Sequence, residues 1–208
     1  MTRGKEQAIV SRRRGGVQDP PLSIDDVVGA AVTVTERAGL DALTVRLVAD
    51  ELRVTPAAVH YHLRGKDDLL DRVCEAVSAR IEPAVDPGAP CADRYVELVL
   101  NMDRTLSRYP GVAARALAAT GSSPAARRIA DLALSILRDA GLDRAEAAEV
   151  VAASQFLLTG WLVLRDRGKA HPALDAAGVG SPADATVDRL ANAIRRLLAG
   201  FGVGSASP

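Results

Sequence analysis

Two of the three histidines in the chain belong to the triplet His60-Tyr61-His62, and imidazole rings this close together raise the question of a metal site. Residues two positions apart on a helix point about 200° away from each other, so these rings cannot converge on one ion. The two cysteines, Cys74 and Cys91, lie far apart in the sequence and form no CxxC pair. We therefore expect no metal and no cofactor.

Motifs for catalysis are also missing from the sequence. It contains no GxSxG, no HExxH and no glycine-rich phosphate loop, and His171 is the only histidine in the C-terminal part. We expect that the protein is not an enzyme and that the triplet lies on a surface that contacts another molecule. A place for Tyr61 in the core of a small domain remains the alternative.

The composition indicates the fold class. The chain has 208 residues, is rich in alanine, valine and leucine, and has only 3% aromatic residues. No run of β-branched residues alternates with period two, so we predict an all-α protein. The formal net charge is zero, so a preference for nucleic acid must come from where the charges lie. Residues 1–22 hold five Lys and Arg residues against two acidic ones, which predicts a disordered basic arm or a solvated tail.

Three successive helix starts position the triplet. Ser23 with Asp26 forms a capping-box pair ahead of a first helix, which Gly39 ends in left-handed conformation. Thr44 caps a short second helix, and Thr55-Pro56 starts a third one directly after it. Two short helices joined by so tight a turn form a helix-turn-helix.

Helix-turn-helix units need a small residue where the helices cross, a left-handed turn and a buried aliphatic residue further on. Ala49, Arg53 and Val59 occupy these three positions. The arginine stands where glycine is commonest, and a left-handed residue other than glycine costs roughly 1–2 kcal/mol. We also expect Leu47, Val48 and Leu52 of the second helix to point inward.

The remaining sequence predicts more helices. One is expected over about 66–81, and the prolines of 83–90 stop it, so this segment is the predicted domain boundary. Further helices are predicted at about 91–108, 111–119, 124–140, 144–166 and 182–199. Asp143 with Glu146 opens the helix 144–166, whose apolar circumference must be covered on nearly every side. The predicted domains are a basic arm (1–22), a helix-turn-helix DNA-binding domain with its connecting helix (23–82), and a helical effector-binding and dimerisation domain (83–208).

The stretch GLDALTVRLVADELRVTPAAVHYHLRGKDDLLDRV, residues 39–73, resembles the tetracycline-repressor (TetR) family of bacterial transcriptional regulators. It has the threonine that opens the second helix, the small residue, the valine after the turn, an aromatic at Tyr61 and a lysine that starts the next helix. The resemblance implies a three-helix DNA-binding domain and a larger helical C-terminal domain for ligand binding and dimerisation. It further implies a homodimer whose third helices lie in major grooves.

Carried over position by position, the resemblance implies the DNA contacts. The groups expected at the phosphate backbone are Thr44, Lys66, Tyr61 and His62. The groups expected at the major groove are Thr55, Pro56, Ala57, Ala58 and His60. Arg46 reaches a base edge or a phosphate. Since the proline and the two alanines have no hydrogen-bonding side chains, we expect modest sequence discrimination that leans on DNA shape.

An effector pocket is predicted among polar or aromatic groups embedded in the apolar C-terminal helices. The candidates are Asn101, Arg104, Tyr109, Ser154, Gln155, Thr159 and Trp161. Each can equally be a satisfied buried polar group or part of a dimer contact.

The leading hypothesis is a dimeric repressor that a small molecule releases from DNA. The alternatives are a constitutive dimeric DNA-binding regulator without an effector, and an all-helical enzyme or scaffold. The expected partners are palindromic double-stranded operator DNA, a second copy of the chain bound through the last two helices, and an unknown small molecule. There is no segment of signal-peptide type, and the apolar run 150–164 is shorter than the ~20 residues that span a bilayer. We therefore expect a cytoplasmic protein without membrane contact.

Overall fold

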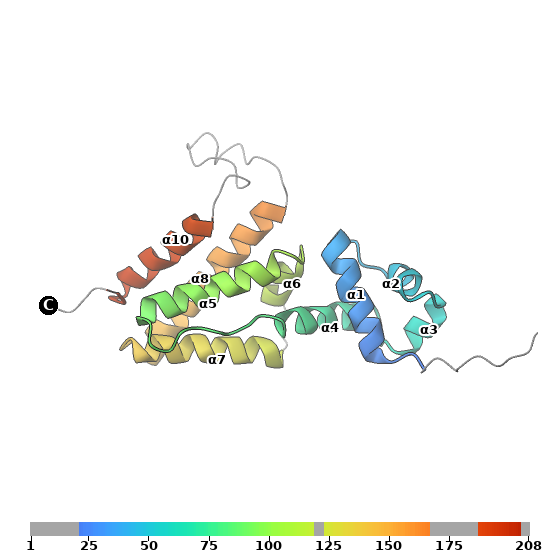
Figure 1. Cartoon of the computed structure of the whole chain (residues 1–208), viewed down its shortest axis with the longest axis horizontal. Helices are drawn as coiled ribbons and strands as arrows, with labels where there is room; N and C mark the ends of the chain where they lie inside the picture. Colours follow the sequence, from blue (N-terminus) through green and yellow to red (C-terminus); the bar gives the residue numbers. More distant parts are fainter. Residues whose placement is uncertain (1–20, 119–122, 167–186, 205–208) are drawn as a thin grey trace, which may run out of the picture.

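The computed structural model describes residues 21–118, 123–166 and 187–204, and within these ranges the regular structure is entirely helical (Figure 1). The helices are α1 (Ile24–Ala38), α2 (Val45–Leu52), α3 (Pro56–Tyr61), α4 (Lys66–Ser78), α5 (Cys91–Leu106), α6 (Val112–Ala118), α7 (Pro124–Asp139), α8 (Arg144–Asp166) and α10 (Val187–Gly200). The first three gather at one end of the molecule, the longer helices fill the other, and α4 connects the two groups (Figure 1). The predicted fold class is confirmed.

The first helix begins at the predicted capping box. The Ser23 N–H donates to the Asp26 carboxylate at 2.9 Å, and the Asp26 N–H donates to Ser23 Oγ at 3.1 Å. These bonds satisfy two N–H groups that a helix start leaves unpaired. The helix then buries Val27 and Ala31 completely. Gly39 ends it with a φ of 81°, but its ψ of 160° lies outside the left-handed helical region that the sequence predicted.

The second and third helices also begin at their predicted caps. Thr44 Oγ1 accepts a hydrogen bond from the Leu47 N–H at 3.2 Å, and Thr55 Oγ1 accepts one from the first turn of α3 at 3.3 Å. Each cap stabilises its helix by about 1 kcal/mol. The inward orientation predicted for Leu47 is wrong, because this side chain is 36% exposed. The fully buried residues of α2 are Val48 and Ala49, and Val45 and Leu52 pack against the core beside them.

The turn between α2 and α3 holds Arg53 in the left-handed region, with φ 57° and ψ 37°. Among the described residues other than glycine, it alone has a positive φ. The Val54 N–H donates to the Ala49 carbonyl at 3.0 Å across this turn, which closes α2 as a Schellman motif does. Ala49 and Val59 are fully buried where the helices cross. The three-position pattern seen in the sequence is therefore confirmed.

The connecting helix α4 begins at Lys66 as expected but ends at Ser78, earlier than predicted. After it, the N–H groups of Arg80 and Ile81 bond to carbonyls three residues back, at 3.0 and 3.1 Å, so the last turn tightens. The tightened turn places Ile81 in the core, where it is 2% exposed.

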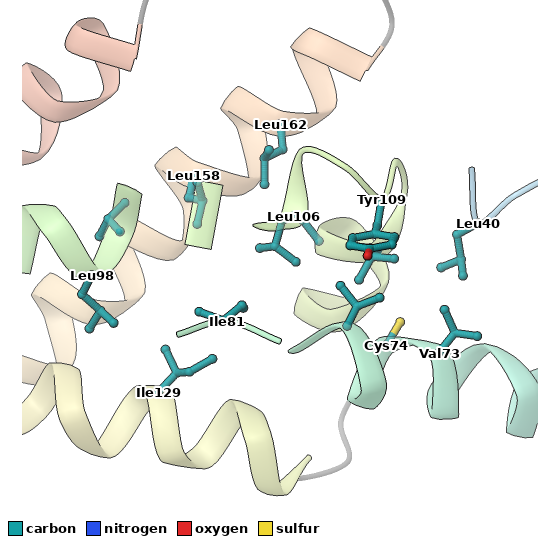
Figure 2. Close-up of a cluster of buried hydrophobic side chains, with 14 of the residues drawn as sticks. Leu40, Val73, Cys74, Ile81, Leu98, Leu106, Tyr109, Ile129, Leu158 and Leu162 are labelled. Atoms are coloured by element: carbon teal, nitrogen blue, oxygen red, sulfur yellow. The ribbon is translucent and has the colours of Figure 1, made fainter. Parts of the chain in front are cut away.

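The C-terminal helices surround a shared apolar core. Figure 2 shows Ile81 between side chains of α5, α7 and α8, namely Leu98, Ile129 and Leu158. The capping box predicted for α8 is confirmed, since Asp143 and Glu146 exchange hydrogen bonds of 2.9 Å. The start predicted for the last helix at 181–182 lies outside the described residues.

Helix α8 is long and apolar enough to cross a membrane, but only by length and composition. It contacts α5, α6, α7 and α10, and it buries Val150, Leu158 and Leu162 against them. One side of α8 is therefore packed in the core. Its other side remains open: Phe156 is 64% exposed and Leu157 is 42% exposed.

Candidate nucleic-acid interface and effector cavity

The outer face of α3 carries the residues predicted to face the major groove. Val59 is its buried anchor, while Thr55, Pro56, Ala57 and His60 are exposed and Ala58 is partly buried. The structure therefore brings the predicted groove residues onto one short, outward-facing helix. The face offers the Thr55 hydroxyl and the His60 imidazole as its hydrogen-bonding side chains.

The triplet ends this helix. Tyr61 is 87% exposed, so its alternative place in a domain core is wrong. Its ring meets the His62 ring edge-on, with centroids 5.3 Å apart. Within the described ranges, no group of three or more His, Cys, Asp and Glu side chains is arranged to hold a metal ion.

The predicted phosphate contacts lie on the elements that flank α3. The Thr44 hydroxyl already accepts the α2 cap bond, Arg46 is exposed in the first turn of α2, and Lys66 is exposed at the first position of α4. Arg46, Arg53 and Lys66 form no ion pair within the described part of the chain. Their charge is therefore available to an anion outside the protein.

A cavity of about 460 Å³ lies among the helices of the C-terminal part. Its walls come from α5, α6, α7, α8 and the end of α4, and seven alanines contribute to them. Those alanines are Ala113, Ala116, Ala126, Ala130, Ala133, Ala148 and Ala152. This size is typical of a site for a drug-sized molecule.

The polar groups of the cavity wall are few. Tyr95 and Ser154 share a hydrogen bond of 2.5 Å, and Ser154 Oγ also donates to the Val150 carbonyl. Burial raises the pKa of Tyr95 to about 12. Gln155 and Ser78 complete the polar lining, and none of the described lining residues carries a charge. Of the predicted pocket residues, the cavity thus brings together Ser154 and Gln155.

The other predicted pocket residues lie elsewhere. Asn101 donates to the Ala84 carbonyl at 3.1 Å and also bonds to Arg104, which pairs with Glu97 on the surface of α5. Thr159 is 8% exposed, and its hydroxyl has no partner among the described residues.

Trp161 belongs to a polar cluster between α5 and α8. Its Nε1–H donates to Asp103 at 3.1 Å, and Arg165 pairs with the same carboxylate at 3.1 Å. Asp103 is only 2% exposed. Sequence reasoning missed Asp103 and Tyr95, because the residues that satisfy them lie about 60 positions further along the chain.

Tyr109 packs where the two helix groups meet. Its ring is 1% exposed, its hydroxyl accepts a 2.5 Å bond from Arg80, and in Figure 2 it lies between Leu106 and Leu40. The buried thiol of Cys74 lies in the same cluster, and burial raises its pKa to about 11, which makes it unreactive at neutral pH.

Ion pairs connect the helices at the DNA-binding end with those around the cavity. Arg115 of α6 pairs with Asp71 at 2.7 Å and with Asp67 at 3.2 Å, both on α4. Arg108 pairs with Glu36 of α1 at 2.6 Å. Arg115 is the more informative, because its helix lines the cavity while its partner Asp67 follows Lys66 directly. No sequence signal marks this pair, which joins residues 48 positions apart.

The backbone makes a further link beside these pairs. The Leu40 N–H donates to the Pro110 carbonyl at 2.9 Å. Gly111 has a φ of 86°, and a Cβ there would lie 3.2 Å from the Leu40 Cβ. The positive φ therefore favours glycine at 111, and a Cβ there would also make a tight contact with Leu40.

The sequence matches to known proteins include the DNA-binding helices α1–α4. The family model described as "Bacterial regulatory proteins, tetR family" matches residues 27–73, which run from α1 into α4. An HTH-type transcriptional regulator of Saccharopolyspora erythraea is 30% identical over 134 residues, or 64% of this chain and 57% of that protein. The class E tetracycline repressor protein of Escherichia coli is 36% identical over 59 residues, or 28% of each chain. The matched regions thus span less than two thirds of these relatives.

The fold likeness extends over both helix groups. The crystal structure of the Streptomyces coelicolor TetR family protein ActR in complex with (S)-DNPA superposes with a TM-score of 0.70 at 23% identity, covering 89% of this chain and 100% of that one. The curated relatives named above are regulators, as expected for a chain without a catalytic motif. Residues 27–73 therefore match the TetR family of bacterial transcriptional regulators, and the helical fold of the chain is similar to that of a TetR family protein.

Proposed function

We propose that the protein is a dimeric transcriptional repressor that binds palindromic operator DNA and leaves it when a small molecule enters the cavity. The observation that carries the DNA-binding part is the outward face of α3. This helix and its neighbour α2 each begin at a threonine cap, and the cations beside them form no ion pair with the described residues. Non-specific attraction to phosphate comes from such cations, and selectivity comes from the side chains in the groove.

The division of labour within α3 follows from chemistry. His60 carries the imidazole that reaches base edges, whereas Tyr61 and His62 meet the sugar-phosphate backbone. Ala57 and Ala58 contribute contact with thymine methyl groups only. Discrimination between sequences is therefore modest and depends on DNA shape as well as on bases.

Dimerisation is proposed through α8 and α10. The open side of α8 exposes Phe156, Leu157 and the small residue Gly160, and an apolar side of this kind needs a cover. A second copy supplies it, with Gly160 allowing close approach of two helices. The two α3 helices of such a dimer then meet two half-sites of one operator.

Effector binding is proposed at the alanine-lined cavity, and ActR is a fold relative whose structure contains a small molecule. Helix α6 links cavity and DNA-binding end, because it lines the cavity and carries Arg115, which holds the first turns of α4. A ligand that displaces α6 therefore shifts α4 and Lys66. The domain boundary proposed at 83–90 lies between α4 and the cavity helices.

Duplex selection from a random pool, followed by fluorescence anisotropy at several salt concentrations, tests DNA binding. We expect a palindromic consensus whose affinity falls steeply with salt. Arg46→Ala lowers the affinity and the salt slope, whereas Arg144→Ala, an exposed arginine at the start of α8, changes neither. Failure of the wild type to bind any duplex at low salt contradicts the proposal and favours a scaffold role.

The same selection separates the residues of α3. Tyr61→Ala weakens binding to all selected duplexes alike, whereas His60→Ala changes which duplex is preferred. Equal loss at every duplex for His60→Ala contradicts its role at the bases. The alternative function is a constitutive regulator without an effector. It predicts the same DNA-binding results, but no small molecule binds in the cavity.

A further inference from the structure

The wall chemistry of the cavity restricts what it can bind. None of the described residues that line it carries a charge, and most of its surface is alkyl. An ion brought into such surroundings without a partner loses its hydration and gains nothing equivalent. An ionised carboxylate, phosphate or ammonium group is therefore a poor occupant, whatever the shape of the rest of the molecule.

The Tyr95 and Ser154 hydroxyls form the polar spot in the wall, and the direction of their hydrogen bonds is defined. Ser154 has one hydroxyl hydrogen, which it donates to the Val150 carbonyl at 2.5 Å. The bond between Tyr95 and Ser154 must then use the hydrogen of Tyr95, so Tyr95 donates and Ser154 accepts. Both hydrogens are used within the protein. The Tyr95 oxygen keeps its lone pairs, so this spot accepts hydrogen bonds and has none left to donate.

The remaining polar side chains of the wall are Gln155 and Ser78. Gln155 lines the cavity, and its amide makes no hydrogen bond to another described residue. It can donate or accept, so it tolerates a range of substituents. Selectivity therefore lies at Tyr95, which burial keeps protonated, since the pKa of this phenol is raised to about 12.

We propose that the effector is an uncharged, mainly aromatic or hydrocarbon molecule that carries a hydroxyl or N–H group to donate to the Tyr95 oxygen. This inference rests on the proposed function only in taking the cavity as the effector site. The walls of small alanine side chains suit a broad, flat ring system, because they leave width between the helices.

Two sets of matched probes test the inference by isothermal titration at about pH 6.5. Each set is a hydroxy compound, its methyl ether and its carboxylate: 2-naphthol, 2-methoxynaphthalene and 2-naphthoate, and the corresponding derivatives of pyrene. We expect the hydroxy compound of at least one set to bind, at least about 100-fold more tightly than its carboxylate, since the charge has no partner. It should bind about three- to tenfold more tightly than its methyl ether, which has no hydrogen to donate.

Tyr95→Phe identifies the acceptor. It should abolish the preference for hydroxyl over methyl ether and leave the discrimination against carboxylate intact. Tyr109→Phe is the control, because that tyrosine is equally buried but outside the cavity, and it should preserve both preferences. Equal binding of carboxylate and hydroxy compounds, or no binding of either hydroxy compound, overturns the inference.

These titrations contain no DNA, so they fail or succeed independently of operator binding. A protein that binds hydroxypyrene but no duplex keeps the inference and loses the proposed function. A protein that binds duplex but neither hydroxy compound loses the inference and keeps DNA binding.

Discussion

Alanine serves opposite purposes in the two ends of this molecule. In the helix-turn-helix unit, Ala49 is fully buried and lets α3 cross α2 without a gap. Around the cavity, seven alanines line a space of about 460 Å³ that larger side chains would fill. The difference indicates that the DNA-binding end has one packed arrangement, whereas the other end keeps room for a guest. The same residue type thus allows close packing in the helix-turn-helix and leaves space for a ligand in the C-terminal part.

The contrast between the two ends predicts that the DNA-binding end loses stability when a buried side chain is shortened. Leu43 is fully buried between α1 and α2, so Leu43→Ala should lower the free energy of unfolding by about 2–5 kcal/mol. Leu47→Ala, which removes the same atoms from a side chain that is 36% exposed, should cost less than about 1 kcal/mol. Urea denaturation followed by circular dichroism measures both. Similar losses for the two variants contradict the burial contrast.

Replacing an alanine by leucine at each end tests the same contrast directly. Ala49→Leu forces methyl groups into a filled crossing and should cost about 1–3 kcal/mol. Ala133→Leu places the same atoms into existing space, so its stability should stay within about 1 kcal/mol of the wild type or rise. Thermal unfolding of the two variants checks this. A destabilisation of Ala133→Leu as large as that of Ala49→Leu shows that the cavity closes without a guest.

The smallest expected effect on stability concerns the link between the ends. Arg115 pairs with two exposed aspartates, and such pairs contribute only about 0–1 kcal/mol. Arg115→Ala should hardly change unfolding, yet it should speed amide hydrogen exchange in the first turns of α4. Arg104→Ala is the control, since that arginine pairs within α5. Unchanged exchange in α4 means that the pair does not connect cavity and DNA-binding end.

Local signals explain which parts were predictable. The pair Ser23 and Asp26, like Thr44 and Thr55, acts through hydrogen bonds between residues three apart, so sequence alone revealed these caps. The left-handed turn at Arg53 followed from its place four residues after the small residue Ala49 in the helix-turn-helix pattern.

Tertiary partners explain which parts were not predictable. Tyr95 and Ser154 are separated by 59 positions, and only the packing of α5 on α8 brings them together. Periodicity placed Leu47 inward, but in the structure this side chain is 36% exposed. Of the pocket candidates, Trp161 and Thr159 lie on α8, whose apolar circumference gives no periodic signal for which side faces the cavity.

The bond between Trp161 and Asp103 has a practical consequence. The chain contains one tryptophan, and it lies at the contact of α5 with α8. An indole whose N–H bonds to a carboxylate emits according to that local field, so tryptophan emission, excited at a wavelength that tyrosine does not absorb, comes from one known position. Separation of α5 from α8 will change its emission wavelength, while events confined to α1–α3 will leave the tryptophan spectrum unchanged.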